Sequence, residues 1–160
     1  ARDSCNRRRA RPGVSTPLLI DDHLLLRILL DDEPVELRPG GAQIATTGLW
    51  YHRLCRALAD QAVVGSMSRR LGNLDSRSAA DTIASVIDLP DTIALQSLRT
   101  LAWPMAELVH AGARLNLMSL EALAAALRLG AEICLADVDD NEPLRSAAQR
   151  FGVSLRSIPG

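Results

Sequence analysis

The sequence predicts a single α/β domain of three layers, in which helices cover both faces of a central, mostly parallel β-sheet. Two short apolar runs, Leu18–Ile20 and Glu132–Ala136, have the length and composition of buried strands. Longer segments of helical periodicity, with capping residues at their starts, alternate with the runs expected to form strands. The chain has 160 residues, 48% of them hydrophobic, which is enough for one domain with a substantial core.

The first half of the chain is expected to open with a disordered, Arg-rich leader over residues 1–16, followed by the α/β domain over residues 17–160. The first strand is predicted over 17–21 and the first helix over 22–31, because Asp21, Asp22 or both can cap that helix. Residues 43–45 form either a short strand or the approach to a second helix. Thr46 or Thr47 is expected to cap that helix, which runs to about residue 64 with Trp50 facing the core.

The second half contains further helix starts and strands. Ser78 and Asp81 form a capping box for a helix to about residue 88, and Thr92–Gln96 is rich enough in β-branched and apolar residues for a strand. Residues 98–111 are helical in pattern, with Pro104 predicting a kink or a helix start near Trp103, whose ring is expected in the core. A helix is predicted over 120–129, capped by Ser119 and ended by Gly130, and the strand Glu132–Ala136 follows it. The last two predicted elements are a helix over 141–151, capped by Asp140 or Asn141, and a strand over 153–158.

The charge of the chain is unevenly distributed. All 18 basic residues are Arg, and five of them lie in the first eleven residues, so the net charge of −1 divides into +4 there and −5 elsewhere. An acidic body is a poor surface for duplex nucleic acid. Three widely spaced cysteines (Cys5, Cys55 and Cys134) match neither a disulfide framework nor a zinc motif, which predicts reduced thiols in a cytoplasmic protein. No apolar run is long enough to span a membrane, so no membrane partner is expected.

Acidic side chains follow two of the predicted strands. Asp21 and Asp22 come directly after the first strand, and Asp137, Asp139 and Asp140 come after the strand that ends at Ala136. The carboxyl ends of parallel strands are where open α/β sheets bind ligands. Clustered carboxylates are the usual ligands of Mg²⁺ or Mn²⁺, although capping of the following helices explains the same aspartates.

Two segments resemble the PIN-domain family, which includes the ribonucleases of toxin–antitoxin systems. The run Leu19-Ile20-Asp21-Asp22-His23-Leu24-Leu25 is similar to the opening of that family: an apolar strand, an Asp, a short polar pair and an apolar helix. The closing segment is similar to the family's end, through Glu121–Ala126, Leu129–Ala131, Ile133–Asp137, Leu144–Ala148 and Gly152–Leu155. The resemblance covers residues 17–58 and 92–158.

The resemblance implies four acids that bind Mg²⁺ or Mn²⁺ and activate water to cleave RNA. Asp21 matches the first acid and Asp137 the last, although Leu135 replaces the Thr that precedes the last acid in the family. The third acid is Glu121 by chemistry or Ser119 by spacing. For the second acid, residues 42–59 contain no Glu, and Tyr51 or His52 stands there instead. Asp139 or Asp22 is a possible substitute ligand, so the predicted metal set is Asp21, Glu121, Asp137 and Asp139.

The incomplete acid set predicts a degenerate member with weak or no nuclease activity, which binds RNA or protein. Its implied partners are RNA, a small antitoxin-like protein or a second copy of the chain. A non-enzymatic interaction module, pairing through Leu-rich helices around Ala124, Ala125 and Ala126, is the main alternative. A degenerate response-regulator receiver domain is another, because paired acids follow the first strand in such domains. That family implies a Lys in a late loop, and this chain has none.

Overall fold

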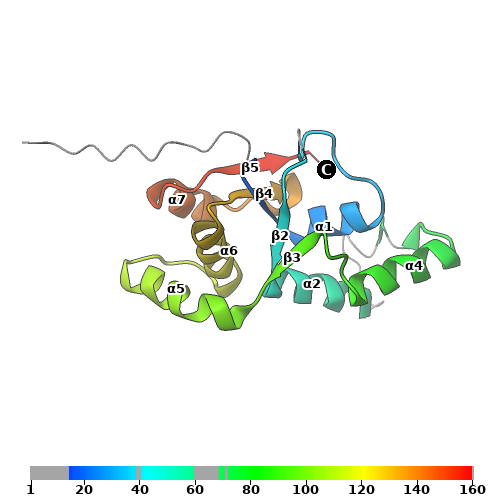
Figure 1. Ribbon diagram of the computed structural model, residues 1–160, viewed down its shortest axis with the longest axis horizontal. Coiled ribbons are helices and arrows are strands. Elements are labelled where there is room, and N and C mark those ends of the chain that lie inside the picture. Colours follow the sequence, from blue (N-terminus) through cyan, green and yellow to red (C-terminus); the bar gives the residue numbers. More distant parts are fainter. Residues whose placement is uncertain (1–14, 39–40, 60–68, 71, 160) are drawn as a thin grey trace, which may run out of the picture.

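The computed structural model describes residues 15–38, 41–59, 69–70 and 72–159. Five strands form one sheet in which every pair of neighbours is parallel, in the order β3-β2-β1-β4-β5. Figure 1 shows this sheet between two groups of helices, so the predicted three-layer α/β architecture is confirmed. The strands are β1 (Leu18–Ile20), β2 (Ile44–Thr47), β3 (Ile93–Gln96), β4 (Glu132–Ala136) and β5 (Leu155–Ile158).

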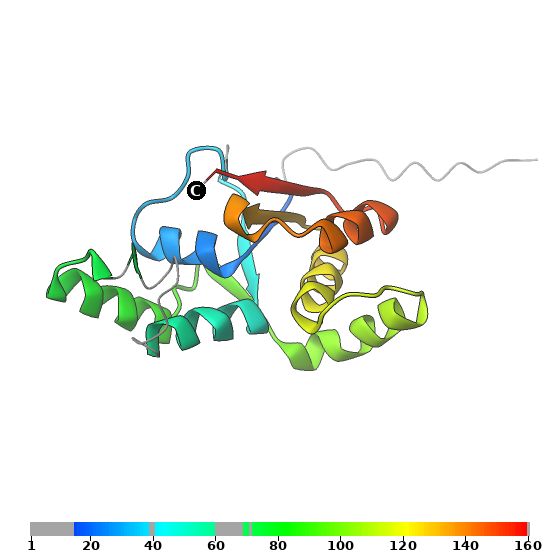
Figure 2. The same ribbon diagram turned by 180° about the vertical axis from the view of Figure 1, so that it is seen from behind.

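Each face of the sheet carries its own hydrophobic core. On β1, Leu18 and Ile20 belong to one core and Leu19 belongs to the other, because successive side chains of a strand point to opposite faces. Helices α1, α2 and α4 lie on one side of the sheet and α5, α6 and α7 on the other, as the two views show (Figures 1 and 2). The helices are α1 (Asp22–Leu29), α2 (Gly48–Ala59), α4 (Ser76–Ile87), α5 (Leu98–His110), α6 (Leu117–Leu129) and α7 (Glu142–Arg150).

Several predicted helix starts agree with the structure. Asp21 caps α1 through Oδ1, which accepts a hydrogen bond from the Leu24 amide at 2.9 Å. Asn141 caps α7 in the same way, through the Leu144 amide at 3.1 Å. Gly130 ends α6 in the left-handed region, with φ at +62°, where glycine is favoured. For residues 43–45, the strand alternative is the correct one, because β2 begins at Ile44.

Two other caps were predicted wrongly. Helix α4 begins at Ser76 and is capped by Asp75, which accepts from the amides of Arg77 and Ser78, rather than by Ser78. Helix α6 begins at Leu117 and is capped by Asn116, whose Oδ1 accepts from the Ser119 amide, rather than by Ser119. In both places a second capping residue lies three positions upstream, and using it adds nearly one turn to the helix.

The predicted helix over 98–111 is confirmed as α5, but the alternative of a helix start near Trp103 and the core position of Trp103 were wrong. The helix runs from Leu98 through Pro104 to His110, capped by Ser97, so it does not begin near Trp103. It buries Leu101 and Met105, and this leaves the Trp103 ring 74% exposed instead of in the core.

Two predictions fall outside the described residues: most of the leader over 1–16, and the end of the second helix near residue 64. Within the described part of the chain, no helix combines the length and hydrophobicity that crossing a bilayer requires. Ala124, Ala125 and Ala126 lie in the core against the sheet, so they serve internal packing.

Candidate functional site at the reversal of strand order

The sheet reverses its direction of growth between β1 and β4. From β1 the chain adds β2 and β3 on one side, then returns to add β4 and β5 on the other. In open α/β sheets the crevice outside the carboxyl ends of two such strands is the usual ligand site. In this chain β1 is followed directly by Asp21 and Asp22, and β4 by a short 3₁₀ turn, Asp137–Asp139. The predicted acids of both strands therefore reach the same edge of the sheet.

Asp21 is fully buried and joins the two strands. Its Oδ1 accepts from the Leu24 amide at 2.9 Å, and its Oδ2 accepts from the Ala136 amide at 2.7 Å. Burial raises the pKa of Asp21 to about 7, although the two backbone hydrogen bonds act to lower it. Both carboxylate oxygens are thus already hydrogen-bonded to the fold.

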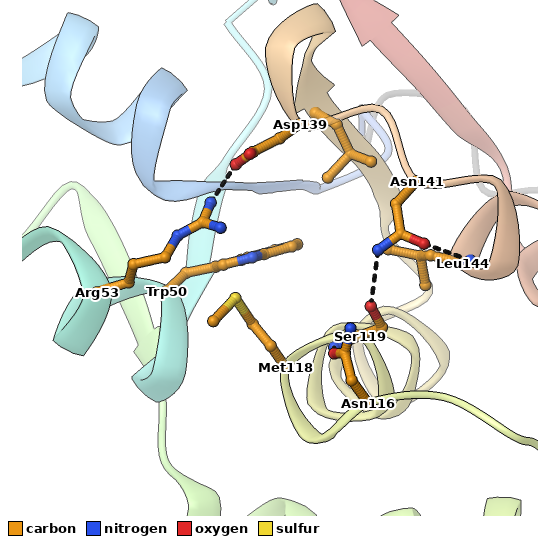
Figure 3. Close-up of a pocket in the computed structure, with 9 residues that line it drawn as sticks. Trp50, Arg53, Asn116, Met118, Ser119, Asp139, Asn141 and Leu144 are labelled. Atoms are coloured by element: carbon orange, nitrogen blue, oxygen red, sulfur yellow. Dashed lines mark hydrogen bonds and ion pairs between the residues drawn. The ribbon is translucent and has the colours of Figure 1, made fainter. Parts of the chain in front are cut away.

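Asp22 is also fully buried, and its charge is balanced by Arg53 of α2. Nε and Nη2 of Arg53 donate to the two carboxylate oxygens of Asp22, and Nη2 donates also to Asp139. The guanidinium lies between Asp22 at the start of α1 and Asp139 in the turn after β4, and Figure 3 shows it pointing at Asp139. Burial alone would lower the pKa of Arg53, but the two carboxylates outweigh it and raise that pKa, so the side chain stays charged.

The residues around Arg53 could otherwise hold a metal ion. Ligand atoms of Asp22, His23 and Asp139 all lie within 4.8 Å of one another, and Nε2 of His23 is 3.8 Å from Oδ2 of Asp139. Carboxylate and imidazole ligands in such a group fit a divalent cation by chemistry. Arg53, however, already hydrogen-bonds to both aspartates. The set therefore does not fit a metal while Arg53 holds this position.

A pocket of about 190 Å³ opens beside this ion pair. The caps of two helices, Asn116 of α6 and Asn141 of α7, lie on its wall, and Nδ2 of Asn141 donates to Oγ of Ser119 at 3.1 Å. Figure 3 shows these side chains facing Trp50 and Met118 across the pocket. The full lining is Trp50, Arg53, Asn116, Met118, Ser119, Leu135, Asp139, Asn141 and Leu144.

The four predicted metal ligands do not come together. Asp21 and Asp139 lie at the reversal point, and Asp139 lines the pocket. Asp137 is exposed at the start of the 3₁₀ turn and is not part of the pocket wall. Glu121 is fully buried and faces α2, where its Oε2 accepts from the Leu49 amide at 2.9 Å. Its Oε1 has no hydrogen-bond partner among the described residues.

Of the residues in the site, Ser119 was only an alternative in the sequence prediction and Arg53 was not predicted at all. Ser119, which spacing had suggested as the counterpart of the family's third acid, lies in the pocket, whereas Glu121 does not. Arg53 was not predicted because the family resemblance implies an acid within residues 42–59, and this Arg directly follows His52 there. A basic residue in a stretch expected to supply a carboxylate was the signal available in the sequence.

No protein-family model matches the chain, and the curated proteins contain no significant match.

Proposed function

We propose that this chain is a PIN-like domain that binds single-stranded RNA without hydrolysing it, and that Arg53 takes the place of the divalent cation. The proposal is supported by one observation above all: the guanidinium of Arg53 hydrogen-bonds to Asp22 and Asp139 together. A bidentate Arg–carboxylate pair is among the stronger charge-assisted interactions in proteins. Asp22 is buried, so a metal that displaced Arg53 would have to replace the whole of that interaction.

The chemistry of the guanidinium explains why hydrolysis would be lost. A divalent cation promotes cleavage because it polarises a phosphoryl oxygen and makes its bound water a nucleophile near neutral pH. Arg53 can neutralise carboxylates and donate hydrogen bonds, but it has no coordination site for water. Asp21 is also not free to act as a general base, because both of its carboxylate oxygens accept backbone hydrogen bonds.

The pocket has groups suited to a phosphate or a sugar. The amino ends of α6 and α7, marked by Asn116 and Asn141, meet at its wall, and helix amino ends favour anions. Its volume of about 190 Å³ is smaller than the roughly 300–1,000 Å³ of most small-molecule sites. One nucleotide unit of a flexible single strand is therefore the proposed ligand, rather than a duplex.

The test combines binding and cleavage with one labelled single-stranded RNA. We expect an increase in fluorescence anisotropy on binding, and intact RNA on a gel after incubation with Mn²⁺. Asn141→Asp keeps a capping residue on α7 but adds a negative charge to the pocket, so it should weaken binding several-fold. The matched control is Ser97→Asp, which adds the same charge at the cap of α5, outside the pocket. Equal binding by Asn141→Asp, Ser97→Asp and the unmodified chain would refute the pocket as the RNA site.

A metal-dependent ribonuclease is the second candidate, favoured by the proximity of Asp22, His23 and Asp139 within 4.8 Å. It requires Arg53 to move away when the metal binds. Cleavage by the wild-type chain in Mn²⁺, lost in Asp22→Asn, would establish it in place of the first proposal. Binding to a small antitoxin-like protein, implied by the family resemblance, stays a prediction.

The receiver-domain alternative loses support from the strand order. Receiver domains have the order 2-1-3-4-5, whereas here β2 lies between β1 and β3.

A further inference from the structure

The pocket at the sheet edge contains a hydrogen-bond donor that the fold leaves unused. Trp50 is 4% exposed and lines the pocket, yet within the described part of the chain no group accepts a hydrogen bond from its indole N–H. Figure 3 shows the indole extending from α2 toward Asn141. A buried indole N–H usually has an acceptor, so this donor is available to a ligand.

Two residues of α6 add further unused donors to the pocket wall. Asn116 caps the helix through Oδ1, which accepts from the Ser119 amide at 2.8 Å, and this leaves its Nδ2 hydrogens for a ligand. Oγ of Ser119 accepts from Nδ2 of Asn141, and its own hydroxyl hydrogen has no acceptor among the described residues. Ser119 is buried, and Asp139 is the one carboxylate in the pocket lining. The uncommitted polar groups of the wall are therefore mostly donors.

The charge and the apolar surface of the pocket favour a neutral ring as the ligand. Asp22 and Asp139 carry two negative charges against the single positive charge of Arg53, so a phosphate that entered here would meet a net negative charge. The apolar part of the wall, which includes Met118 and Leu135, suits a flat base better than a hydrated anion. In a single strand the bases can leave the stack and enter a pocket. The base is thus the part of a nucleotide that fits this pocket.

We propose that the pocket takes one base of the strand and that it selects uracil. The inference rests on the proposed binding of single-stranded RNA and names the base that the site reads. Uracil has no amino group, and its O2 and O4 are acceptors for the unused donors of Trp50, Asn116 and Ser119. Its one ring N–H can donate to Asp139. Cytosine carries an amino group in place of O4, so a donor of the base would meet a donor of the wall.

Anisotropy titrations of the full chain with labelled oligouridine and oligocytidine of equal length test this selection. The two RNAs have the same backbone, so the ratio of their Kd values reports the base alone. We expect oligouridine to bind about 10-fold more tightly, which is a typical effect of one good contact to a base.

Asn116→Asp should reduce the preference for uracil. Asp keeps a capping residue on α6 and replaces the free amide donors by a carboxylate, which accepts from the amino group of cytosine. The Kd ratio should therefore fall several-fold toward oligocytidine. Ser97→Asp is the matched control, because it adds the same charge at the cap of α5, outside the pocket, and should leave the ratio unchanged.

Trp50→Phe tests the second wall, because it keeps an aromatic ring and removes the indole N–H. It should also lower the Kd ratio, and circular dichroism with urea unfolding would check that the variant is folded. Equal binding of both RNAs by the unmodified chain would overturn base selection and leave RNA binding in place. Binding of neither RNA would overturn the proposed function and this inference with it. A ratio that both variants leave unchanged would overturn the assignment to this pocket.

Discussion

Replacing Arg53 by Met tests the central ion pair, because Met keeps much of the side-chain length and removes the charge. Asp22 is fully buried and would lose its counter-charge. Breaking a buried ion pair by removing one partner costs about 3–5 kcal/mol. The Arg53 side chain is 34% exposed, so water compensates in part, and we expect the free energy of unfolding to fall by about 2–3 kcal/mol.

The same variant is expected to gain a response to metal. Without the guanidinium, the carboxylates of Asp22 and Asp139 and the ring of His23 are left as a set of ligands. A ligand present at about 100 times its Kd stabilises the folded state by about 2.7 kcal/mol, so millimolar Mn²⁺ should restore most of the lost stability. The wild-type chain should show no such shift.

Urea unfolding with and without Mn²⁺ measures both effects. Arg99→Met, at an exposed position on α5, is the matched control and should change neither stability nor metal response. In Asp22→Asn combined with Arg53→Met, both the charge imbalance and the metal response should be reduced. If Mn²⁺ stabilises wild type as strongly as Arg53→Met, the reasoning that Arg53 excludes the metal is refuted.

Two further predictions concern buried acids. Because the pKa of Asp21 rises from 3.8 to about 7 on folding, the folded state binds the extra proton, and Asp21 lowers stability as pH increases from about 4 to 7. Asp21→Asn should remove this part of the pH dependence, measured by urea unfolding across that range, and an unchanged slope would contradict the assignment. Glu121→Ala should destabilise the fold by about 1–3 kcal/mol, because the partly buried Leu49 amide at the start of α2 loses its acceptor. The folded Glu121→Ala variant should bind RNA as well as the unmodified chain in the anisotropy assay. A loss of binding would show that Glu121 belongs to the RNA site.

The sequence predicted the parts of the fold that depend on neighbouring residues. The Leu18–Ile20 strand, the Asp21 cap and the Gly130 helix end each follow from a few consecutive positions. The caps at Ser78 and Ser119 failed because Asp75 and Asn116 upstream have the same capping chemistry. Local preference cannot decide between two capping residues three positions apart.

The site was harder to predict than the fold because it depends on contacts across the chain. Arg53 and Asp139 are 86 positions apart, and Ser119 and Asn141 are 22 apart. Glu121 illustrates the same limit: its acidity suggested a metal ligand, but the turn of α6 directs it at the amino end of α2. Spacing had pointed to Ser119, and for this position spacing located the pocket residue better than chemistry did.

The single carboxyl group of Asp21 accepts from two amides that are far apart in the sequence, those of Leu24 and Ala136. Protonation of that group would therefore weaken hydrogen bonds at two places, the first turn of α1 and the end of β4. In a nuclear magnetic resonance titration, the two amide signals should move together with one midpoint near pH 7. The first turn of α1 and the turn that carries Asp139 would then change together on protonation of the same carboxyl group.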